Sequence, residues 1–118
     1  MLPEDFLEFS KKFEGGFLYW IEDDKPLMIR ADFQITGEKV DVTPRESNFI
    51  KAPAPGLPAT LLFANPFYTE RCEMGVVKGE LKAGGGKGRL EIVAHDITWT
   101  LSFDLNEYPE RLVRRWRR

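Results

Sequence analysis

A strict alternation of apolar and polar side chains over residues 27–35 constrains the fold of this chain more than any other sequence feature. The apolar residues, at every second position, are Leu27, Ile29, Ala31, Phe33 and Ile35. A repeat of two is typical of a β-strand that packs one face against a core. The residues between them, on the opposite face, are Met28, Arg30, Asp32 and Gln34.

Further strand-like runs, separated by turn residues, follow one another along most of the chain. The predicted strands cover residues 17–21, 27–35, 39–43, 60–64, 74–82 and 89–96, and another alternating run covers 97–105. The first run is wholly apolar, which predicts a strand buried on both faces. Turns are expected at 23–26 and 36–38, and residues 83–88 are expected to form the tip of a hairpin.

Both ends of the chain have the sequence pattern of a short helix. Near the N-terminus an apolar stripe at helical spacing is formed by Leu2, Phe6, Phe9 and Phe13. Pro3 suits the first turn of this helix, and the glycine pair at 15–16 ends it. A second short helix is predicted from Tyr108 and Pro109, with apolar residues Leu112, Val113 and Trp116. Helix, short strands and helix in this order indicate a mainly β barrel or sandwich.

The composition fits one folded domain over residues 1–118. Hydrophobic residues make up 42% of the chain and charged residues 31%, which suits a packed core beneath a solvated surface. No apolar run approaches the roughly 20 residues of a membrane span, and the N-terminus lacks the pattern of a secretion signal. Cys72 is the only cysteine, so no disulfide can form within the chain. We therefore expect a cytoplasmic protein.

Positive charge is concentrated at the C-terminus of a chain whose formal net charge is −2. The arginines of this tail are Arg111, Arg114, Arg115, Arg117 and Arg118. They favour contact with an acidic partner, such as residues of a second subunit. A nucleic-acid-binding barrel is the least favoured hypothesis, because the rest of the chain is acidic and supplies no second basic patch.

The residue types that usually carry catalysis are scarce. The glycine-rich run 84–88 lacks the spacing of a phosphate-binding loop, so we interpret it as a hairpin tip. His95 is the only histidine and Cys72 the only thiol, which leaves no typical zinc site. No acid, base or nucleophile is predicted to be catalytic, and no metal is expected.

A group of anion-binding side chains is predicted around Arg30. This residue shares a strand face with Asp32, and the sequence is equally compatible with an exposed ion pair and with a groove in which Arg30 binds phosphate or carboxylate. The loop after the third strand adds Thr43, Arg45, Ser47, Asn48 and Lys51. These side chains suit an anion, although a solvated polar loop would look the same. Prolines exclude a continuous helix over 44–58.

Three stretches of the chain are similar to a known group of flavoproteins. The opening residues that carry the likeness are Met1, Leu2, Pro3, Phe6, Glu8, Phe9, Lys11, Phe13, Glu14 and Gly15. They resemble the start of the small bacterial FMN-binding proteins. Residues 17–43, with the turn at 23–26, and the strands at 59–63 and 75–81 resemble the larger group of pyridoxamine 5′-phosphate oxidase-like split barrels.

The resemblance implies a six-stranded antiparallel split barrel that forms a homodimer with FMN in the groove between subunits. In that group polar and basic side chains hold the flavin phosphate, and Arg30, Thr43 and Ser47 match their positions. The sequence departs from the group after Ser47, where Asn48, Phe49 and Ile50 replace the usual basic residue and the start of a helix. Arg45 or Lys51 is expected to substitute.

The leading hypothesis is an FMN-binding split barrel with short flanking N- and C-terminal helices. Its expected cofactor-binding residues are Arg30, Thr43, Arg45, Ser47 and Lys51. FMN would make the protein a flavin-dependent oxidoreductase or an electron-transfer protein. The alternative is a split barrel that has lost FMN and serves as a binding or assembly module.

Overall fold

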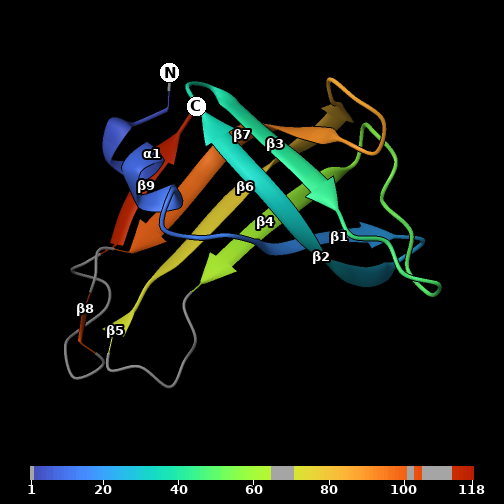
Figure 1. Ribbon diagram of the computed structural model, residues 1–118, viewed down its shortest axis with the longest axis horizontal. Helices are drawn as coiled ribbons and strands as arrows, with labels where there is room; N and C mark the ends of the chain where they lie inside the picture. Colours follow the sequence, from blue (N-terminus) through green and yellow to red (C-terminus); the bar gives the residue numbers. More distant parts are fainter. Residues whose placement is uncertain (1, 65–70, 101–102, 105–112) are drawn as a thin grey trace.

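The computed structural model describes residues 2–64, 71–100, 103–104 and 113–118 (Figure 1). Its elements, in chain order, are one helix and nine strands: α1 (Glu4–Ser10), β1 (Gly16–Glu22), β2 (Lys25–Thr36), β3 (Lys39–Pro44), β4 (Pro58–Ala64), β5 (Arg71–Cys72), β6 (Met74–Ala83), β7 (Leu90–Thr100), β8 (Phe103–Asp104) and β9 (Val113–Arg117). The alternating run 27–35 lies within β2, as predicted.

The long strands form one antiparallel sheet that closes into a barrel. The strand order is β3-β2-β1-β4-β6-β7-β9, and a further pairing of β3 with β7 joins the two sides of the sheet. Six strands therefore make the barrel, β9 extends it from β7, and β5 pairs separately with β8. The structure confirms the predicted mainly β fold, with its six-stranded antiparallel barrel and its short N-terminal helix.

An aromatic cluster joins α1 to the barrel core. Phe63 of β4 is 1% exposed, and its ring lies 6.1 Å from that of Phe9 and 4.9 Å from that of Phe13. Phe33 of β2 stacks on the same ring at 4.7 Å. Phe6, which is fully buried, contacts both Phe63 and Trp99. The predicted apolar stripe therefore covers part of the core, although α1 ends at Ser10 rather than at the glycine pair 15–16, so that Phe13 packs from the segment that follows the helix.

The first strand is buried on one face only, which corrects the expectation drawn from its apolar sequence. Leu18 and Trp20 lie in the core, whereas Phe17 is 42% exposed and Ile21 is 56% exposed. The barrel has its core inside, so every second residue of β1 faces outward whatever its hydrophobicity. An apolar strip on the outer surface results.

The end of the chain is a strand rather than the predicted helix. Residues Val113–Arg117 form β9 and pair with β7, with Thr100 opposite Val113 and Asp96 opposite Arg117. Trp116 packs against the core, and alternate arginines reach the outer face of β7. The sequence pattern of residues 113–117 fits the two-residue repeat of a strand as well as it fits a helical turn. Residues 108–112, where that helix was expected to begin, lie outside the described residues.

The predicted run 89–96 and the first four residues of the run 97–105 share one long strand, whereas Phe103–Asp104 forms β8 and residues 101–102 and 105 lie outside the described residues. β7 continues from Leu90 to Thr100, and its pairing with β6 shifts register between Lys78 and Gly79. Lys78 lies opposite Asp96 and Gly79 opposite Ala94, so His95 is the extra residue of a β-bulge. The bulge explains why the apolar positions change phase after Ala94.

Candidate functional site

A row of cross-strand neighbours on the outer face places an arginine beside an aromatic ring. Arg30 of β2 lies opposite Phe17 of β1, and Phe17 lies opposite Leu62 of β4. On the other side of Arg30, the backbone N–H of Arg45 donates to the Arg30 carbonyl at 2.8 Å. Directly opposed residues share a sheet face, so cationic and apolar groups lie next to each other here.

Arg30 and Arg45 line a polar hollow of about 270 Å³ at this edge. The other residues lining this polar hollow are Glu14, Gly15, Gly16, Ala31 and Asp32. Arg45 binds Asp32 in a bidentate manner, with Nη2 2.7 Å from Oδ1 and Nε 3.2 Å from Oδ2. Both side chains are exposed, so the pair shares this space with solvent.

The charges of the polar hollow are largely matched. The hydrogen bonds from Arg45 hold the pKa of Asp32 below its usual range, and the charges of Arg45 and Arg30 act in the same direction against the opposing effect of desolvation. Glu14 adds a second carboxylate. Arg30 forms no ion pair with any residue that the structure describes, and it is therefore the arginine here best placed to bind an added anion.

The five predicted cofactor-binding residues do not all meet at this hollow. Arg30 and Arg45 line it, and Thr43 is exposed nearby on β3, opposite Asp32. The hydroxyl oxygen of Ser47 instead accepts the N–H groups of Phe49 and Ile50 at 3.2 and 3.1 Å, which closes a turn. Lys51 is exposed and does not line the hollow.

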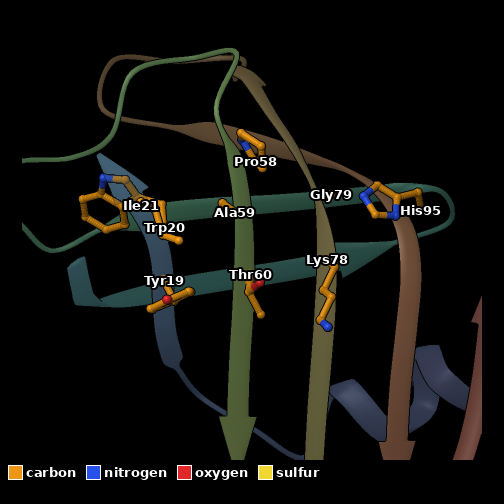
Figure 2. Close-up of a pocket in the computed structure, with 9 residues that line it drawn as sticks. All are labelled: Tyr19, Trp20, Ile21, Pro58, Ala59, Thr60, Lys78, Gly79 and His95. Carbon is orange, nitrogen blue, oxygen red and sulfur yellow. The ribbon is translucent and has the colours of Figure 1, made fainter. Parts of the chain in front are cut away.

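A second, more apolar hollow of about 320 Å³ lies over β1, β4, β6 and β7. The residues lining this apolar hollow are Tyr19, Trp20, Ile21, Pro58, Ala59, Thr60, Lys78, Gly79 and His95. Figure 2 shows Tyr19, Thr60 and Lys78 side by side across three strands, with His95 beyond Gly79 on β7. Gly16 of β1 lines the polar hollow, whereas Tyr19, Trp20 and Ile21 of the same strand line the apolar hollow.

A histidine at the β-bulge lines the apolar hollow. His95 is the extra residue between Ala94, which lies opposite Gly79, and Asp96, which lies opposite Lys78, and neither His95 nor Asp96 is buried in the core. The sequence prediction missed Lys78, since nothing local distinguishes it from other strand lysines. The bulge itself could have been predicted from the sequence, because the apolar alternation breaks between Ala94 and Ile97.

Arginines of β9 neutralise the carboxylate beside the bulge. Arg115 donates to Asp96 through Nη2 at 2.8 Å and Nε at 3.1 Å, and Arg117 Nε lies 3.9 Å from Oδ2. The hydrogen bonds from Arg115 lower the pKa of Asp96, and the charges of Arg115, Arg117 and Lys78 contribute further. Arg115 and Arg117 of the arginine tail thus interact within the fold, which leaves fewer of its arginines available to bind nucleic acid.

Exchange of Asp96 for asparagine is expected to weaken the attachment of β9 in a pH-dependent manner. The pKa of Asp96 is lower in the folded state, so its ionised form stabilises the fold at neutral pH. That contribution is lost as the pH falls through the depressed pKa. Urea unfolding should give Asp96→Asn a lower free energy of unfolding than the parent protein at pH 7. This difference should disappear at acidic pH. Asp41→Asn on β3 is the control. A stability difference between Asp96→Asn and the parent that does not depend on pH would contradict the stabilising role of the ionised Asp96 side chain.

Comparisons with known proteins give one informative match. No family model and no curated protein matches this chain. Among solved structures, the fold is similar to that of the FAD binding protein from Mycobacterium smegmatis, with a TM-score of 0.65 and 12% sequence identity. The match covers 84% of this chain and 93% of that one. At this identity the likeness establishes a shared barrel fold, and the fold is one on which a flavin-binding protein has been built.

Two kinds of feature are missing from the residues that the structure describes. None of their helices is long and apolar enough to cross a membrane. Nor do these residues contain a group of three or more histidine, cysteine, aspartate or glutamate side chains that could hold a metal ion.

Proposed function

We propose that this barrel is a flavin-binding protein of the pyridoxamine 5′-phosphate oxidase-like type and that its flavin is FMN. The observation that carries the proposal is the placement of Arg30 beside the exposed ring of Phe17. A flavin needs an apolar surface for its ring system and a cationic donor for its phosphate, and this row supplies both. The fold shared with an FAD-binding protein supports the same conclusion.

Arg30 would hold the phosphate, with Thr43 and Arg45 beside it. Arg45 is already bonded to Asp32, so its share in phosphate binding would be smaller than that of Arg30. Ser47 and Lys51, in the loop that follows β3, do not line the polar hollow and are not assigned to the phosphate, and Phe17 would support the ring. When bound, FMN supplies the redox chemistry of an oxidoreductase or electron-transfer protein, while the chain supplies binding and orientation.

The proposal includes a homodimer with the flavin between subunits. Phe17 is 42% exposed and Met28 is 47% exposed, and they lie on the neighbouring strands β1 and β2. Large apolar side chains gathered on an outer sheet face are typical of a surface that another protein covers. Light scattering that reports a single chain in solution would contradict this part of the proposal.

Replacement of Arg30 by methionine is expected to weaken FMN binding by roughly tenfold, because a charge-assisted hydrogen bond to the phosphate is lost. Methionine keeps much of the side-chain volume, and Arg30 is exposed, so the fold should not change. The measurement is a titration of the apoprotein with FMN, followed by the quenching of flavin fluorescence. Lys87→Met, at the tip of the β6–β7 hairpin, is the matched control and should bind FMN like the parent.

A protein that is colourless as purified and also fails to bind added FMN would contradict the flavin proposal. That result would favour the second candidate, a cofactor-free barrel that serves as a binding or assembly module. One observation supports this alternative: Asp32 and Glu14 oppose the two arginines of the polar hollow, so the site can be electrically satisfied without a ligand.

A further inference from the structure

We propose that the apolar hollow is a binding site for a small planar carboxylate, with Lys78 and His95 holding the carboxylate and Tyr19 supporting the ring. The proposal concerns a different ligand from the flavin and a different set of residues. It does not require that FMN be bound. If the protein is a flavoenzyme, this hollow would be the place for its substrate.

The size and the walls of the hollow suit a ligand with one aromatic ring. Its volume of about 320 Å³ is near the lower end of the roughly 300–1,000 Å³ that is usual for small-molecule sites. The half-buried ring of Tyr19 and the exposed side chain of Ile21 form apolar walls. Ala59 and Gly79, which pair across β4 and β6, contribute little side-chain bulk to the lining (Figure 2).

The charge of the apolar hollow favours an anion more clearly than that of the polar hollow. Its lining contains a lysine and a histidine and no carboxylate. In the polar hollow, by contrast, Asp32 and Glu14 accompany the two arginines. An anion entering the apolar hollow would therefore meet donors without first displacing an internal acidic partner.

The acidic residue closest to these donors along the sheet is already engaged. Asp96 lies opposite Lys78, but its two oxygens accept the bidentate hydrogen bonds of Arg115. Lys78 and His95 form no ion pair with any side chain in the described part of the chain. His95 supplies the second donor, because it is exposed at the bulge on β7 and lines the same hollow as Lys78.

The test is an NMR titration of the 118-residue chain with three probes at constant ionic strength. Benzoate carries both the ring and the carboxylate, benzamide keeps the ring without the charge, and acetate keeps the charge without the ring. We expect benzoate to shift the backbone amide signals of Tyr19, Thr60 and Gly79 in a saturable manner. Benzamide and acetate should each bind at least roughly tenfold more weakly, because each lacks one of the two interactions.

Variants separate the proposed donors from a general effect of charge. Lys78→Met should weaken benzoate binding roughly tenfold, and His95→Gln should weaken it by a smaller factor, whereas Lys87→Met should have no effect. The proposal is overturned if benzoate does not bind, if its shifts centre on Arg30 and Arg45, or if Lys78→Met and Lys87→Met behave alike. A protein that binds benzoate as expected but never binds FMN would refute the flavin proposal alone.

Discussion

Replacing Gly79 with alanine is expected to destabilise the barrel by about 3 kcal/mol or more, among the largest effects of a single methyl group in this protein. A Cβ atom at this position would lie 2.7 Å from the carbonyl carbon of Val93 and 2.8 Å from Cγ2 of Ile92. The first of these is backbone, so β6 and β7 must move apart at the bulge. Urea unfolding followed by tryptophan fluorescence measures the loss.

Gly85→Ala is the matched control for this experiment. A Cβ atom at Gly85, in the hairpin between β6 and β7, meets nothing within 4 Å, and the residue does not have a positive φ. Its replacement should leave stability unchanged or raise it by about 0.4–1 kcal/mol through a less flexible unfolded chain. Equal stability of the two variants would show that β6 and β7 do not approach each other as closely as described.

Phe63→Ala is expected to cost about 3–5 kcal/mol, the usual range for removing a large buried aromatic side chain. Phe63 is 1% exposed, and its ring contacts aromatic residues from both α1 and β2. Its loss leaves a cavity beneath the helix, so α1 should also become easier to detach. Hydrogen exchange of the α1 amides, measured beside urea unfolding, should therefore increase more than exchange in β6.

Phe49→Ala removes a side chain of the same kind from the surface. Phe49 is 95% exposed, and the turn that holds it depends on the Ser47 hydroxyl and on backbone groups rather than on the ring. The free energy of unfolding of Phe49→Ala should stay within about 0.5 kcal/mol of that of the parent protein. Comparable losses in Phe63→Ala and Phe49→Ala would contradict the assignment of Phe63 to the centre of the core.

The sequence was most informative where a local period reports directly on burial. Ile29, Ala31 and Ile35 face the core as the alternation predicted, since a strand in a barrel wall has one inner face and one outer face. The stripe that begins with Phe6 and Phe9 likewise predicted a helix that packs on the core, although the helix ends before Phe13. Such patterns need no knowledge of distant residues.

Two of the wrong predictions concern segments whose local pattern was ambiguous. The apolar run 17–21 could not show that the outer face of β1 would remain exposed at Phe17 and Ile21. At the C-terminus, apolar residues at 113 and 116 fit a helical turn, but the arginines at 115 and 117 also alternate around Trp116. The choice of strand depends on pairing with β7 and on Asp96 as a partner, 19 residues from Arg115.

The sequence by itself determined the inward residues of β2, the helix at the N-terminus and the grouping of Arg30 with Arg45, because these follow from spacing along one strand or across one short turn. Tertiary structure alone decided that Asp32 forms an ion pair with Arg45 and that Lys78 and His95 both line the apolar hollow. Those relations depend on side-chain direction and on the register between β6 and β7. A bulge of one residue changes that register after Ala94, so that Asp96 rather than His95 lies opposite Lys78.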